Sequence, residues 1–316
     1  MKPRPDLPQA LAASVGLRVD RIDTPALVVD LDAMERNIAR MADFARKHQV
    51  LWRPHAKMHK SAELALLLQR AGAVGACVQK TAEAEALAAG GVRDITITNQ
   101  VIAHPKLLRV ARLAAHLQTQ GGRLALAVDS AEGVQRLAEA MAQAAPQARI
   151  DVLVEIDVGQ GRCGVPPGAP ALALAQAVAR LTQLRFAGLH AYHGRAQHLR
   201  SAAERREAIA AAVQAARHTR DLITAAGLPV PLVTGSGTGT LVHEAASGVY
   251  GELQAGSFLF MDTDYARNER EPAQPVFEQA LFVKTQVISA CGSHAVCDAG
   301  HKSHPIDSGV PAVALL

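Results

Sequence analysis

The sequence has few aromatic residues, no long block of one charge and no long apolar run. Aromatic residues make up 3% of the 316 residues, and the 33 basic and 29 acidic residues are interspersed. Proteins that bind nucleic acids usually carry a basic stripe or stacking aromatic side chains, so we expect no nucleic-acid partner. The apolar runs are shorter than a bilayer span, so we also expect no membrane partner.

Cysteine is scarce as well. Cys77, Cys163, Cys291 and Cys297 lack the close pairwise spacing of a metal site and are too few for a disulfide framework. A reducing cytoplasm is therefore the expected location. The first twenty residues contain only a short apolar patch, which argues against a signal peptide. The chain is 49% hydrophobic and 20% charged, which indicates a globular protein with a large core and a smaller second unit.

Strands and helices alternate along most of the chain. After a first strand over residues 25–31, Asp32 and Glu35 have the spacing of a helix capping box. Eight further strands are predicted: Val50–Pro54, Val74–Gln79, Asp94–Asn99, Arg123–Asp129, Ile150–Val158, Arg185–Tyr192, Leu232–Thr234 and Glu252–Phe260. Eight such strands close a parallel barrel of the α/β class. An open doubly wound sheet is less favoured, because no G-x-G-x-x-G turn follows the first strand.

The pattern changes after Asp262. Residues 280–290 and 295–297 are predicted as strands with no helix between them, and their natural partner is the first strand. We therefore predict an N-terminal arm (1–22), a barrel (33–275) and a β-domain built from 23–32 plus 276–316. The chain ends in an apolar, strand-like run, so this β-domain is expected to be incomplete.

Lys57 lies between a predicted strand and a helix that begins after Ser61. In α/β folds, chemistry takes place at the carboxyl ends of strands. A lysine in a dry or cationic pocket loses its proton and becomes an amine nucleophile that forms a Schiff base. Most lysines are solvated surface charges, so the rest of the sequence has to decide.

A loop rich in glycine and hydroxyl residues, Thr234–Thr240, follows the seventh predicted barrel strand. Glycines let backbone N–H groups converge on an anion, and hydroxyls add donors. The loops after strands seven and eight of such barrels commonly bind phosphate. The alternative is a flexible turn, and the pattern favours a phosphate site.

Arg162 lies in a second glycine-rich segment, Asp157–Gly164, after the predicted strand over Ile150–Val158. It is placed to donate a charge-assisted hydrogen bond to a ligand. The alternative is an ion pair between Arg162 and Asp157 or Glu155. The residues alone leave both interpretations open.

Three histidines, His190, His193 and His198, lie at the end of the next predicted strand. A histidine with a pKa near neutrality is a natural general base or metal ligand, although a single histidine is more often structural. The cluster favours a functional role without showing which histidine acts. Two more histidines lie within residues 301–307, but their spacing in a proline-containing loop is not diagnostic of a metal site.

A strand-end lysine, a phosphate loop, an arginine and histidines together are what a pyridoxal phosphate site requires. The sequence resembles the D-threonine aldolase and 3-hydroxy-D-aspartate aldolase family, which shares the alanine-racemase-like fold with eukaryotic-type D-serine dehydratase. The motifs that carry this resemblance are Pro54–Lys60, Asp157–Gly164, Ala191–Gly194 with Gln197 and His198, Thr234–Gly239, and Glu252–Ser257.

The resemblance implies a (β/α)8 barrel of alanine-racemase type followed by a C-terminal β-domain, assembled as a homodimer. It implies a pyridoxal phosphate-dependent lyase that cleaves D-3-hydroxy amino acids to glycine and an aldehyde. Lys57 would form the Schiff base, and His198 would take the proton from the β-hydroxyl of the substrate. Arg162 would face the pyridine nitrogen. The residues implied in cofactor binding are Lys57, Arg162, Tyr192, Thr234, Gly237, Thr238 and Gly239.

The resembled aldolases also bind a divalent metal, manganese or magnesium, through a His-x-Asp motif near the C-terminus. The chain ends before any such motif, so the metal ligands stay unassigned, and His301, His304 and Asp307 are not at the matching position. Two alternatives stay open. One is a D-serine or D-3-hydroxyaspartate dehydratase, or an amino-acid racemase, on the same fold. The other is a non-enzymatic pyridoxal phosphate carrier, against which the long segment after the barrel argues.

Overall fold

The computed structural model describes residues 16–306 and 309–314. Eight parallel strands form its central sheet: β2 (Leu51–Trp52), β3 (Ala76–Val78), β4 (Asp94–Ile97), β5 (Arg123–Val128), β6 (Ile150–Glu155), β7 (Leu184–Ala191), β8 (Val233–Gly235) and β9 (Glu252–Leu253). Their order is β2-β9-β8-β7-β6-β5-β4-β3. Cys77 N–H donates to Pro54 O (2.9 Å) and Val74 N–H to Trp52 O (3.0 Å), which joins the two ends of the sheet. The predicted barrel is confirmed.

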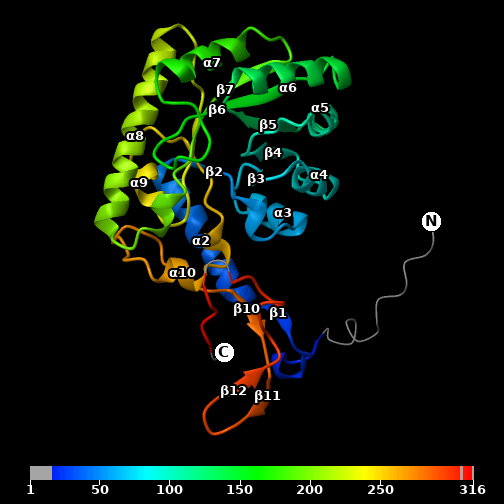
Figure 1. Ribbon diagram of the computed structural model, residues 1–316, viewed down its shortest axis with the longest axis vertical. Coiled ribbons are helices and arrows are strands. Elements are labelled where there is room, and N and C mark those ends of the chain that lie inside the picture. Colours follow the sequence, from blue (N-terminus) through cyan, green and yellow to red (C-terminus); the bar gives the residue numbers. More distant parts are fainter. Residues whose placement is uncertain (1–15, 307–308, 315–316) are drawn as a thin grey trace, which may run out of the picture.

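Helices surround this sheet (Figure 1). The α-helices are α2 (Leu31–His48), α3 (Ala62–Arg70), α4 (Thr81–Ala89), α5 (His104–Thr119), α6 (Ala131–Ala144), α7 (Ala169–Ala179), α8 (Ala202–Ala225), α9 (Leu241–Ala245) and α10 (Thr263–Ala266). The 3-10 helices are η1 (Val19–Arg21), η2 (Ala56–Met58), η3 (Arg195–His198) and η4 (Ser257–Leu259). No helix in this described part of the chain is long and apolar enough to cross a membrane.

The start of α2 differs from the predicted one. The side chain of Asp30 caps the helix by accepting a hydrogen bond from Ala33 N–H (2.9 Å), so the predicted capping role of Asp32 is wrong. Asp30 has extended backbone angles that let its carboxylate reach the first turn, whereas Asp32 already lies within that turn. The apolar stripe of α2 packs inward as predicted, with Met34, Ile38, Met41 and Ala45 buried.

The predicted strand Glu252–Phe260 ends early. Only β9 pairs in the sheet, and the chain then turns through Gly256 into η4. A Cβ atom on Gly256 would lie 2.7 Å from His55 O, so the two segments approach each other more closely than a side chain allows. This turn places Ser257 beside η2, the element that carries Lys57.

The remaining strands form two small antiparallel sheets outside the barrel. The first strand, β1 (Ala26–Val29), pairs with β10 (Leu281–Lys284), as predicted from its lack of a barrel partner. The single strand predicted over 280–290 is two strands, because β11 (Val287–Ala290) turns away and pairs with β12 (Ala295–Cys297). In Figure 1 both sheets lie beyond α2, on the far side from α6 and α7. Residues 309–314 form no strand, and 315–316 lie outside the described residues.

Candidate active site

A cavity of about 230 Å³ opens at the carboxyl ends of the barrel strands. Its lining comes from eight segments of the chain that the barrel brings together. The lining residues are His55, Lys57, Met58, Gln79, Thr98, Arg162, His190, Tyr192, Ser236, Gly237, Thr238, Gln254, Gly256, Ser257 and Tyr265. Five of the seven residues predicted to bind a cofactor are among them, and Thr234 and Gly239 are not.

Lys57 reaches the cavity from η2, just after β2. His55 precedes this turn, and its Nδ1 accepts a hydrogen bond from Lys57 N–H (3.2 Å) while its Nε2 bonds with Thr98 Oγ1 (3.1 Å). The surrounding protein partly desolvates the Lys57 amine and so lowers its pKa, although the side chain as a whole is exposed, and the nearby positive charge of Arg162 lowers the pKa further. Both effects favour the neutral amine, which is the form that attacks a carbonyl group.

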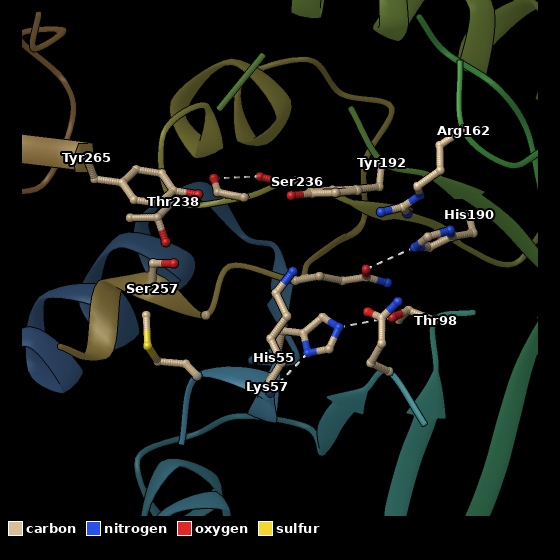
Figure 2. Close-up of a pocket in the computed structure, with 15 residues that line it drawn as sticks. His55, Lys57, Thr98, Arg162, His190, Tyr192, Ser236, Thr238, Ser257 and Tyr265 are labelled. Atoms are coloured by element: carbon tan, nitrogen blue, oxygen red, sulfur yellow. Dashed lines mark hydrogen bonds between the residues drawn. The ribbon is translucent and has the colours of Figure 1, made fainter. Parts of the chain in front are cut away.

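Tyr192 lies between the Lys57 amine and the Arg162 guanidinium. The centroid of its ring is 5.9 Å from Lys57 Nζ and 6.0 Å from Arg162 Cζ. In Figure 2 the hydroxyls of Ser236, Thr238, Ser257 and Tyr265 gather on one side of the Lys57 amine, and Arg162 and His190 lie on the other side. The amine thus lies between a cluster of hydroxyls and a cationic group.

Asp157 does not hold Arg162. The Asp157 carboxylate accepts hydrogen bonds from the N–H groups of Gly159 and Gly161, both at 3.0 Å, and so shapes its own loop. Arg162 extends from this loop into the cavity. The geometry therefore supports the ligand-facing interpretation of Arg162 over the structural ion pair.

Four residues of the cavity wall carry backbone N–H groups with no acceptor within the described residues. Those of Gly237, Thr238, Gly256 and Ser257 donate to no other residue in the described part of the chain, and all four residues line the cavity. Ser236, just before them, has a left-handed φ of 76°, which is unfavourable for a residue with a Cβ atom. Free N–H groups and hydroxyls in one concave loop bind phosphate oxygens.

Gln197 supports this loop from behind. It is fully buried, and its Oε1 accepts a hydrogen bond from Gly239 N–H (3.0 Å). A Cβ atom on Gly237 would lie 2.4 Å from Gln197 Oε1, so the glycine is required by its contact with this side chain. Gly239 therefore belongs to the support of the loop and not to the cavity wall.

Thr234 also lies behind the cavity. Its hydroxyl donates to Glu252 Oε1 (2.8 Å) and accepts from Gln254 Nε2 (2.9 Å). Gln254 in turn lines the cavity, and its Oε1 bonds with His190 Nε2 (3.1 Å). Thr234 therefore does not line the cavity itself, and it fixes the Gln254 amide that holds His190.

His198 lies beside the cavity without lining it. Its Nδ1 is 2.7 Å from Asp264 Oδ2, and its ring centroid is 5.7 Å from that of Tyr265, which does line the cavity. Burial alone would raise the pKa of Asp264, but hydrogen bonds from Arg200 and His198 hold it below the usual value. The carboxylate is therefore ionised and orients the histidine.

Several cavity residues were not singled out individually in the sequence. Gln254 and Ser257 lie in the motif Glu252–Ser257, so a signal for them existed. No local sequence signal marked Tyr265, which lies in the short helix α10, far along the chain from Lys57. The chain has only three tyrosines, and Tyr192, Tyr250 and Tyr265 all lie in or next to this site.

The described residues do not fit a metal ion. No group of three or more histidine, cysteine, aspartate or glutamate side chains in them could hold one. His301 is exposed and His304 is half-buried near the end of the chain, and Asp307 lies outside the described residues.

The fold and the site together define a class. A closed parallel barrel with a lysine at the end of its first strand is the architecture of alanine racemase-like enzymes. The family model for the alanine racemase N-terminal domain matches residues 29–264, so the chain belongs to this family.

Comparison with individual relatives shows which enzymes of this class are similar to the chain. The chain is 44% identical to a D-threonine aldolase from Arthrobacter sp over 302 residues, which cover 95% of this chain and 78% of that protein. It is 40% identical to a 3-hydroxy-D-aspartate aldolase from Paracoccus denitrificans over 309 residues, with 96% and 78% covered. A crystal structure of D-threonine aldolase from Filomicrobium marinum superposes with a TM-score of 0.86 at 45% identity, covering 91% of this chain and 76% of that one. The chain is thus an enzyme, which disfavours the non-enzymatic carrier.

Proposed function

We propose that this protein is a pyridoxal phosphate-dependent lyase that cleaves D-3-hydroxy amino acids to glycine and an aldehyde. The observation that carries the proposal is the position of Lys57 between a phosphate-type cradle and Arg162 within one cavity. The names of the two curated relatives, a D-threonine aldolase and a 3-hydroxy-D-aspartate aldolase, support the same reaction and substrate class.

The cavity fits pyridoxal phosphate at three points. Lys57 would hold the aldehyde carbon, and partial desolvation and Arg162 already favour its neutral amine. The free N–H groups of Gly237 and Thr238 and the hydroxyls of their loop would hold the phosphate. Arg162 would face the pyridine nitrogen and disfavour its protonation. When bound, the cofactor supplies an electron sink for the carbon attached to the substrate amine.

We assign His198 as the base that removes the β-hydroxyl proton. As the proton leaves, the oxygen forms a carbonyl, the Cα–Cβ bond breaks, and its electron pair stays on Cα until a proton gives glycine. With Nδ1 bonded to Asp264, the Nε2 nitrogen of His198 carries the lone pair that accepts this proton. Tyr265 lies closer to the cavity, but burial raises its pKa, so its hydroxyl keeps its proton at neutral pH and no phenolate is available to act as the base.

The proposal is tested by product analysis of the purified protein with added cofactor, with and without manganese. Aldolase activity releases glycine from D-threonine or D-3-hydroxyaspartate. A dehydratase on the same fold would instead release ammonia from D-serine or D-3-hydroxyaspartate. Ammonia without glycine would overturn the proposed reaction and leave the cofactor site intact.

The lysine assignment has a matched control in the neighbouring Lys60, which does not line this cavity and pairs with Glu83 at 3.6 Å. Lys57→Ala should lower turnover by about a thousandfold or more, since both the covalent anchor and a proton carrier are lost. Borohydride treatment followed by peptide mass spectrometry should fix cofactor to Lys57 in the native protein and in Lys60→Ala. Cofactor fixed at another lysine in the native protein would refute the assignment.

A further inference from the structure

A buried carboxylic acid lies behind the phosphate-type loop, and the proposed reaction does not use it. Glu244 lies on α9 with 1% of its surface exposed, and its Oε1 accepts a hydrogen bond from Thr240 Oγ1 (2.7 Å). Its second oxygen, Oε2, has no hydrogen-bond partner in the described part of the chain. The neighbouring His243 and the Arg206 guanidinium both face a different acid, Glu271.

Glu244 is connected to the loop through buried side chains. Gln197 holds Gly239 N–H through its Oε1 and donates from its Nε2 to Thr240 Oγ1 (2.8 Å). Thr240 then donates to Glu244, so the last member of the chain is the carboxyl group. Ser236, a residue of the cavity wall, also interacts with this carboxyl.

The surroundings of Glu244 oppose a negative charge. Burial raises its pKa to about 7, and the hydroxyls of Thr240 and Ser236 offset only part of this effect. The titratable groups that face it are Tyr192 and Tyr250, and burial raises the pKa of both phenols, so both are neutral. A phosphate dianion held on the cavity side of the loop would disfavour a charge on Glu244 still more.

We propose that Glu244 is a positioning residue that carries a proton whenever the Thr234–Thr240 loop holds a phosphate dianion. The proton belongs on Oε2, the oxygen with no partner, from which it can be donated towards Ser236 Oγ. Ser236 bonds only weakly to Gly237 O, at 3.4 Å, so its own hydrogen is free to turn to the phosphate. The inference rests on the proposed function, because it assumes that the loop binds the cofactor phosphate.

The direction of the pH effect follows from linkage. Below about pH 7 Glu244 is neutral in the free protein, and the phosphate binds without a proton change at this group. Above that pH the free protein loses the proton, and binding has to take it up again. Affinity for the phosphate therefore falls as pH rises, by at most about tenfold for each pH unit.

The test uses the Lys57→Ala background, so that covalent bond formation contributes no pH dependence. Pyridoxal phosphate is added to the protein at a series of pH values between about 6.5 and 8.5. Binding is followed by the fluorescence of Trp52, the only tryptophan. Adding Glu244→Gln keeps the shape and hydrogen bonds of the side chain and removes its ionisation. We expect the affinity of the Glu244 form to fall with pH relative to the Gln form. Pyridoxal, which lacks the phosphate, should bind both forms with the same pH profile.

A calorimetric measurement gives a second readout that needs no Glu244 variant. At about pH 8 the cofactor phosphate is already a dianion. Titrations in buffers of different ionisation enthalpy should then show proton uptake close to one per site in Lys57→Ala. Equal pH profiles for the two forms, or no proton uptake, would overturn the inference. Absence of phosphate-dependent binding at every pH would instead overturn the proposed function.

Discussion

A cysteine thiol has a raised pKa in the barrel and a lowered pKa in the terminal sheets. Cys77 lies in β3 with no exposed surface, and burial raises the pKa of its thiol. Cys291 lies in the exposed turn between β11 and β12, where hydrogen bonds from Ser293 and from His294 N–H lower its thiol pKa. Burial therefore governs the thiol in the barrel, and local hydrogen bonds govern the thiol in the exposed hairpin.

The contrast extends to function. Every residue that lines the cavity lies between residues 55 and 265, and none comes from the terminal sheets. All residues of β11 and β12 are exposed, whereas β3 and β6 are buried throughout. Substitutions in the barrel should therefore change binding, activity and stability together, and substitutions in the outer hairpin should change little.

Beyond the Lys57 variant, the largest loss of turnover is expected at the His198–Asp264 pair. His198→Gln should lower kcat by about 10²–10⁴-fold with a small change in KM, because it removes the base and leaves the cavity wall in place. Asp264→Asn should cost less, about tenfold, because the histidine remains and loses only its orienting charge. Steady-state kinetics of glycine release measure both changes.

Tyr265→Phe is the matched control for this pair, since it removes the hydroxyl of the residue that packs beside His198. It should reduce kcat far less than His198→Gln. A larger loss of kcat in Tyr265→Phe than in His198→Gln would mean that the tyrosine, and not His198, is the base.

A large loss of stability is expected at Arg53. This side chain is 2% exposed and bonds to Glu252 (3.0 Å) and Asp94 (2.5 Å) at the base of the barrel. Arg53→Met leaves the buried Glu252 carboxylate unpaired and should lower the free energy of unfolding by about 3–5 kcal/mol. Urea denaturation measures the change.

The charge explanation for Arg53 has its own check. Combining Arg53→Met with Glu252→Gln removes both members of the buried pair and should restore part of the lost stability. If the double variant is as unstable as the sum of the two single variants, the loss comes from packing and not from the unpaired charge.

The smallest effect is expected in the outer hairpin. Ile288 in β11 is 65% exposed, so Ile288→Thr should change the free energy of unfolding by less than about 0.5 kcal/mol. Cofactor affinity should be unchanged, as measured by the same titration. A clear loss of affinity would show that the terminal sheets contribute to the site after all.

Much of the site was predictable because its signals are local. The lysine follows a short strand, and glycines alternate with hydroxyls directly after another strand, so Lys57, Gly237 and Thr238 could be found from neighbouring residues alone. The residues alone left the role of Arg162 open, and the family resemblance implied the cofactor contacts of Arg162 and Tyr192. All five line the cavity. The strand predicted at β9 was too long, because apolar residues continue past Leu253 although the chain turns at Gly256.

Periodicity and turn residues act over a few positions, so the barrel, the order of its strands and helices and the lysine at its first strand could be predicted from the sequence. Which side chains share the cavity depends on the folded structure. Thr234 and Gly239 lie behind the cavity wall, Tyr265 lines it, and Glu244 is buried with one carboxyl oxygen unpartnered in the described part of the chain. Burial and the distance between charges depend on residues far apart in the chain, and these quantities shift the pKa values of Lys57 and Glu244.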